Sequence, residues 1–195
     1  MTEQEKKLAR SYLEAINLDG LKLSEKAEKV AKEISKIPWG SEKTVEGVLQ
    51  NKNGNCTGKH KLLQACFDVL HVRYNTVVCT FKWGEQEIRY PENLQRILWE
   101  GEWEHGHNFV QLAEGNYLDV TWDPRLSGFG FRVLPESWTT QDSFVGVINI
   151  KRRWDGAPID ETKQDLINAL PKVLQERRER FLEEFEKWIN EIHKN

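Results

Sequence analysis

A predicted β-hairpin is the feature that most restricts how this chain can fold. The segments HNFVQL (107–112) and NYLDVTW (116–122) both have the composition and alternation typical of strands, and three residues separate them. A three-residue hairpin loop needs a left-handed residue at its third position, which suits Gly115. The sequence therefore predicts two antiparallel strands joined by a tight loop, with Leu112 paired to Asn116.

The register of this hairpin selects a carboxylate partner for one histidine. With Gly115 at the end of the loop, Asp119 lies opposite Phe109, on the same face as His107 and one diagonal step from it. A loop moved by one residue would place Asp123 opposite His107 instead. The position of the glycine favours the first register, so we expect Asp119 beside His107 and keep Asp123 as the alternative.

Helical periodicity flanks the strands on both sides. The expected helices are 3–20, 24–37, 44–50, 56–71 and 160–193, the last one broken near Pro171. The expected further strands are 73–81 and 143–150, and residues 82–106 form a long connection that contains a small helix. This order predicts a single α+β domain over 1–195, with a core at about 40–150, N-terminal helices over 1–37 and a C-terminal helical extension over 160–195.

Capping residues mark the predicted helix ends. Thr2 and Glu5 form a capping box for the first helix, and Ser24 is suited to cap the second. Gly54 is suited to a left-handed helix end, and Asn55 to the N-cap of the following helix.

Composition and charge exclude several classes of protein. Of 195 residues, 38% are hydrophobic and 30% charged, which is typical of a globular domain and not of a disordered chain. A net charge of -3 gives no reason to expect nucleic acid or an anionic membrane as a partner. No stretch approaches the roughly 18 apolar residues of a membrane span, and no signal peptide is evident at the start. We therefore expect a cytoplasmic protein; its oligomeric state is not predicted.

Cys56 differs in its surroundings from the other two cysteines. Cys66 lies on the apolar face of a predicted helix, and Cys79 lies inside an apolar strand, as buried cysteines usually do. Cys56 follows Asn55 in the first turn of a predicted helix, where unpaired N–H groups and the helix dipole lower a thiol pKa. Its own N–H can face a developing oxyanion. We interpret Cys56 as a nucleophile.

A cysteine nucleophile needs a histidine base and an orienting side chain. His60 shares the helix of Cys56, while His71 and His193 are expected to face solvent or cap helices, which leaves His105 and His107. His107 is favoured because it opens the strand that faces Asp119 or Asp123.

Several supporting roles remain open at this stage. The candidates for a second oxyanion donor are Gln50 and Trp39. The candidates for the walls of a substrate groove are Trp83, Trp99 and Trp103, although core packing explains them equally well.

Two alternatives to an enzyme follow from the same residues. Cys56, His60, His105 and His107 are possible zinc ligands, but the paired spacing of zinc-binding loops is missing. An inactive binding module, with the C-terminal helices as its docking surface, is the stronger alternative.

The segments NGNCTGKHKLLQACFDVLHVRYNTV (53–77) and HNFVQLAEGNYLDVTWDP (107–124) resemble the transglutaminase-like superfamily, over about residues 44–124. The resemblance implies a papain-like fold, in which a central helix carrying Cys56 packs on an antiparallel sheet. It implies that Cys56 is the nucleophile, His107 the general base and acid, and Asp119 the orienting carboxylate.

The implied activity is hydrolysis or acyl transfer at a protein or peptide amide bond, through a thioester and without a cofactor or metal. The family often has Trp at the position of Phe109, and its usual interval from histidine to aspartate is longer than here. The N-terminal helices and the C-terminal extension match no part of the family core.

Overall fold

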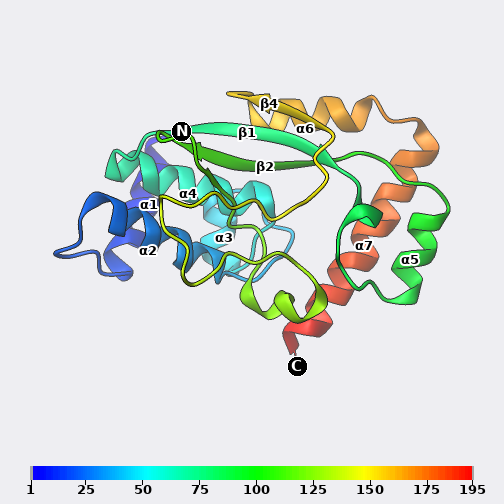
Figure 1. The fold of residues 1–195 in the computed structure, drawn as a ribbon, viewed down its shortest axis with the longest axis horizontal. Coiled ribbons are helices and arrows are strands. Elements are labelled where there is room, and N and C mark those ends of the chain that lie inside the picture. Colours follow the sequence, from blue (N-terminus) through cyan, green and yellow to red (C-terminus); the bar gives the residue numbers. More distant parts are fainter. Residues whose placement is uncertain (1, 195) are drawn as a thin grey trace.

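The computed structural model describes residues 2–194 and has an α+β architecture, as predicted. The elements are α1 (Glu3–Ala15), α2 (Leu23–Ser35), α3 (Val45–Asn51), α4 (Cys56–Leu70), β1 (Tyr74–Phe81), η1 (Trp83–Glu85), α5 (Glu92–Trp99), β2 (His105–Leu112), β3 (Tyr117–Leu118), η2 (Pro124–Phe129), β4 (Arg152–Asp155), α6 (Ile159–Asn168) and α7 (Lys172–Lys194). The strands form one antiparallel sheet in the order β3-β2-β1-β4. Helices α1 to α4 lie on one side of this sheet, and α5 and α7 lie beyond its end (Figure 1).

The predicted hairpin register is confirmed. Leu112 donates its N–H to the Asn116 carbonyl at 2.8 Å, and Val110 faces Leu118 across the ladder. Gly115 has a φ of +91°, in the region that a side chain disfavours. The strand predicted to reach Trp122 ends at Leu118, however. Beyond it, the Asp119 carboxylate accepts the N–H of Thr121, and this local bond replaces a ladder bond.

The prediction of a strand over 143–150 is wrong. Two backbone N–H groups in residues 143–150 bond side chains and not a neighbouring strand. Gly146 N–H donates to the Asp119 carboxylate at 2.8 Å, and Ile148 N–H donates to the Gln86 side chain at 2.9 Å. The strand that follows is β4 at the sheet edge. Its exposed Arg152 and Arg153 are the kind of charged residues that protect an edge strand from pairing with other chains.

The predicted helix ends are partly corrected. The Thr2–Glu5 capping box and the Asn55 cap are confirmed, and Pro171 separates α6 from α7. The cap of α2 is Lys22, whose N–H bonds the Glu25 carboxylate at 2.7 Å, so Ser24 lies inside the helix. The first helix already ends at Ala15.

Lys52, and not Gly54, takes the left-handed conformation after α3, with a φ of +53°. Gly54 is needed for close packing instead, since a Cβ there would lie 2.8 Å from a methyl group of Val48.

The sheet separates two hydrophobic clusters. On one face, Val110, Leu112 and Leu118 pack with the buried faces of α1, α2 and α4. On the other, β1 and Phe109 join an aromatic cluster completed by α5 and α7. The C-terminal extension is therefore part of the core and not a separate tail.

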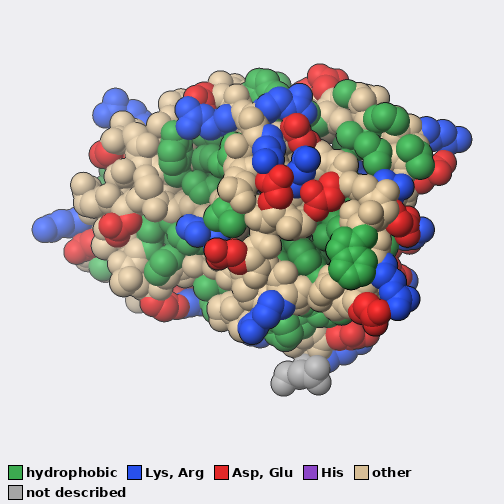
Figure 2. All heavy atoms as spheres, turned by 45° about the vertical axis from the view of Figure 1, so that its right-hand side comes forward, with side chains coloured by type: hydrophobic (Ala, Val, Ile, Leu, Met, Phe, Trp, Pro, Cys, Tyr) green, Lys and Arg blue, Asp and Glu red, His purple; other side chains and the backbone are tan. Residues whose placement is uncertain are grey.

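The side of the molecule that carries α5 and α7 has no large patch of one charge. Figure 2 shows basic and acidic side chains interspersed there, with hydrophobic side chains between them. Within the described chain, none of the helices combines the length and the apolar character that a bilayer span requires.

Candidate active site

Cys56 is the first residue of α4, and its position is set by the loop before it. The Asn55 side chain accepts the N–H groups of Thr57 and Gly58 at 2.9 and 3.2 Å, which caps the helix without using the N–H of Cys56. A Cβ at Gly58 would lie 2.3 Å from the Glu42 carbonyl, so only glycine lets this loop approach the helix so closely. Cys56 as a residue is partly exposed, and it lines a cavity of about 520 Å³.

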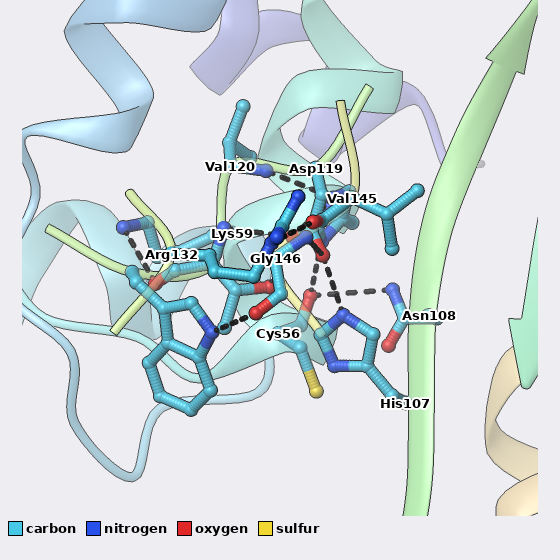
Figure 3. Close-up of polar contacts among 12 residues, drawn as sticks. Cys56, Lys59, His107, Asn108, Asp119, Val120, Arg132, Val145 and Gly146 are labelled. Carbon is cyan, nitrogen blue, oxygen red and sulfur yellow. Dashed lines mark hydrogen bonds and ion pairs between the residues drawn. The ribbon is translucent and has the colours of Figure 1, made fainter. Parts of the chain in front are cut away.

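His107 lies on β2 between the Cys56 sulfur and the Asp119 carboxylate (Figure 3). Its Nε2 is 2.6 Å from Asp119 Oδ2. The other ring nitrogen, Nδ1, is thereby left for the Cys56 thiol, which lies close enough to His107 to raise the pKa of the imidazole. The structure thus brings together the three residues that the sequence analysis selected, in the order thiol, imidazole and carboxylate.

The Asp119 carboxylate is buried and fully used as an acceptor. It receives the Thr121 hydroxyl at 2.6 Å and the N–H groups of Thr121 and Gly146 at 3.0 and 2.8 Å. Burial alone raises the pKa of Asp119, but the charge and hydrogen bond of His107 hold it well below its usual range. The carboxylate therefore stays charged and rigid beside the imidazole.

The electrostatics favour an ion pair between Cys56 and His107. Burial raises the pKa of Cys56, but the Lys163 ammonium and the hydrogen bond and charge of His107 lower it to about 6. Burial lowers the pKa of His107, but the charge and hydrogen bond of Asp119 raise it to about 9. Between these values the thiolate and the imidazolium are both the favoured forms.

Lys163, which the sequence analysis did not select, makes the closest charged contact with the thiol. Its Nζ on α6 is 3.1 Å from Cys56 Sγ, 2.9 Å from the Thr57 hydroxyl and 2.5 Å from Asn108 Oδ1. Lys163 is spaced with Ile159 and Leu166 on one face of α6. A lysine on an otherwise apolar stripe is the sequence signal that could have identified it.

Asn108 and His60 fix the first turn of α4 from two sides. Asn108 Nδ2 donates to the Cys56 carbonyl at 3.2 Å, and His60 Nδ1 lies 2.7 Å from the same oxygen. His60 Nε2 accepts the N–H of Val120 at 3.3 Å. Burial lowers the pKa of His60 to about 4, so this imidazole is neutral and structural. Among residues 2–194, no group of three or more His, Cys, Asp or Glu side chains is arranged to hold a metal ion.

Asp123, the alternative to Asp119, lies in a different set of contacts. Its carboxylate accepts the N–H of Trp39 at 2.9 Å and lies 3.0 Å from His193 Nε2 and 3.1 Å from Arg125 Nε. We expected His193 to face solvent or to cap a helix; it lies in the last turn of α7 and is paired with Asp123. Asp123 connects the end of α7 to the loop before the site.

The remaining candidates divide between the cavity and other regions. Gln50 lies on α3 and donates to Glu46, away from the cavity lining. Trp39 and Trp83 do line the cavity, whereas Trp103 is buried in the aromatic cluster and Trp99 is 75% exposed. Helices α6 and α7 form the remaining wall and contribute, among others, Lys163, Arg178 and Leu182.

A comparison with protein-family models finds no match for the chain, and a search of curated proteins finds no similar sequence.

Proposed function

We propose that this protein is a cysteine-dependent amide-bond enzyme with a transglutaminase-like core, acting on a protein or peptide through a thioester. The observation that carries the proposal is the relay of Cys56, His107 and Asp119 at the edge of a cavity. Its support is chemical: a thiol with a lowered pKa at a helix N-terminus, an imidazole in reach of it, and a buried carboxylate that orients the imidazole.

In the proposed reaction, the Cys56 thiolate attacks the carbonyl carbon of the amide, and the carbonyl oxygen takes the negative charge. The N–H of Cys56 faces that oxygen as one stabilising donor. The tetrahedral intermediate then expels the amine, which takes its proton from the His107 imidazolium. This leaves a thioester on Cys56 and a neutral His107.

The second half of the reaction resolves the thioester. Neutral His107 removes a proton from water, or from a second amine, as it attacks the thioester carbonyl, and the Cys56 thiolate is released. Water gives hydrolysis and an amine gives acyl transfer. The relay supports both outcomes equally, so the proposal covers the two.

The inactive binding module explains fewer of the observed features. It gives no role to a cysteine that lines a cavity beside a charged imidazole, and it would use α6 and α7 as a docking surface. These helices instead wall the cavity and supply Lys163, and α7 packs one face, with Phe181, Phe185 and Ile189, into the aromatic cluster.

Trapping the thioester tests the proposal without knowledge of the natural substrate. We expect p-nitrophenyl acetate to acetylate Cys56, as measured by peptide mass spectrometry after an acid quench. Cys66 is the internal control, because burial raises its thiol pKa to about 12. The proposal fails if Cys56 is acetylated no faster than a thiol of a short unstructured peptide, or equally fast in a His107→Ala protein.

A further inference from the structure

Lys163 is a cation without a carboxylate partner inside the proposed site. Its ammonium bonds the Cys56 sulfur, the Thr57 hydroxyl and the Asn108 amide oxygen, of which only the sulfur can become anionic. In the described part of the chain, the nearby Asp160 pairs with Lys61 at 2.6 Å, and no ion pair includes Lys163. Its charge is therefore balanced by negative charge that develops at Cys56 or on a molecule bound there.

The position of the ammonium is fixed before any substrate arrives. Thr57 holds it against the first turn of α4. Asn108 holds it from β2 and is itself tied to the Cys56 carbonyl at 3.2 Å. A donor that is already oriented costs little reorganisation when charge develops, which is what makes an oxyanion donor effective.

The geometry also places this donor near the sulfur to which the substrate carbonyl would bond. When Sγ bonds to a carbonyl carbon, the carbonyl oxygen is two bonds from the sulfur. An ammonium 3.1 Å from Sγ is therefore close to the space that this oxygen would occupy. Of the two sequence candidates for this role, Gln50 lies outside the cavity, whereas Trp39 lines it but, in the described part of the chain, makes no hydrogen bond with the Cys56 sulfur.

We propose that Lys163 is the second oxyanion donor of the site, acting together with the N–H of Cys56. Its ammonium neutralises the Cys56 thiolate before attack and, from the same position, bonds the carbonyl oxygen as that oxygen takes the charge. The lysine keeps its proton throughout, while the leaving amine takes its proton from His107. This inference rests on the proposed function, and it makes α6, outside the resembling segment, part of the catalytic machinery.

Reaction with two different electrophiles distinguishes an oxyanion donor from a residue that only stabilises the thiolate. Iodoacetamide reacts with a thiolate by displacement at a saturated carbon, and no oxyanion forms. p-Nitrophenyl acetate reacts through a tetrahedral oxyanion. Both rates at Cys56 are measured at pH values at which the thiolate is fully formed in each protein, so that a change in thiol pKa does not affect either rate.

At those pH values, we expect Lys163→Met to slow acetylation of Cys56 about 10²-fold, the usual effect of losing one oxyanion donor. We expect alkylation to change less than about threefold. Lys163→Arg keeps a cation and should recover part of the acetylation rate. The matched control is Lys61→Met, since Lys61 is a partly exposed lysine that pairs with Asp160.

Equal slowing of both reactions in Lys163→Met would overturn the inference and leave Lys163 as a residue that only holds the thiolate. If acetylation of Cys56 were slow in the unmodified protein and unchanged in His107→Ala, the proposed function itself would be wrong. Thermal unfolding of each variant shows whether the fold is kept. If Lys163→Met does not fold, the same comparison on the Lys163→Arg protein decides, because an imperfectly placed cation must still slow acetylation more than alkylation.

Discussion

The Asp119→Asn protein is expected to form the thioester at Cys56 but to hydrolyse it about 10²- to 10⁴-fold more slowly, the range usual for loss of a general base. The carboxylate accepts from His107, Thr121 and Gly146, and an amide NH₂ would face an N–H group at either oxygen position. His107 then loses the charge that raises its pKa and the acceptor that orients it. The acetyl group on Cys56 should therefore accumulate, and its decay can be followed by mass spectrometry.

Asp123→Asn is the matched control for this prediction. It makes the same chemical change in a second buried aspartate, whose contacts are Trp39, Arg125 and His193. We expect its thioester to decay within about tenfold of the unmodified rate, since the general base is intact. If Asp123→Asn accumulated the thioester and Asp119→Asn did not, the assignment of the orienting carboxylate would be wrong.

Phe185→Ala is expected to lower the free energy of unfolding by about 3–5 kcal/mol, the usual cost of removing a buried phenylalanine. Phe185 lies on α7 with no exposed surface, and its ring centroid is 4.9 Å from those of both Trp39 and Trp83. Urea unfolding followed by tryptophan fluorescence measures the change. Because both tryptophans also line the cavity, slower acetylation of Cys56 should accompany the loss of stability.

Val173→Ala provides the comparison on the same helix. Val173 is 58% exposed in the first turn of α7, and its truncation should change the free energy of unfolding by less than about 0.5 kcal/mol. A loss below about 1 kcal/mol in Phe185→Ala would mean that α7 contributes little to the core. The helix would then be free to act as the docking surface of a binding module.

The features that sequence reasoning located depend on local signals. The Gly115 loop determines the hairpin register, and this register brings Asp119 to His107 across a short distance along the chain. The Asn55 cap determines where α4 begins and hence where Cys56 lies. Each of these signals acts over a few residues, so it can be recognised without a structure.

The features that sequence reasoning missed depend on contacts between distant parts of the chain. Residues 143–150 have the composition of a strand, but the Asp119 and Gln86 side chains accept backbone N–H groups that would otherwise bond a neighbouring strand. Lys163 reaches Cys56 from a helix that begins about one hundred residues later; the apolar stripe of α6 marks Lys163 as inward-facing, but it does not show that α6 packs against β1 and β2. The aromatic cluster around Phe185 similarly combines residues from Trp39 to Ile189.

The central claim, that Cys56 is an activated nucleophile, is tested most directly by the pH dependence of its alkylation with iodoacetamide, measured by peptide mass spectrometry. The charged groups facing the thiol are Lys163, His107 and Arg178. They favour the thiolate, so the pKa of about 6 predicts rapid alkylation well below the pH at which a free thiol of pKa about 8.5 reacts. His107→Ala should move the midpoint to higher pH. A midpoint near that of a free thiol, unchanged in His107→Ala, would contradict the account.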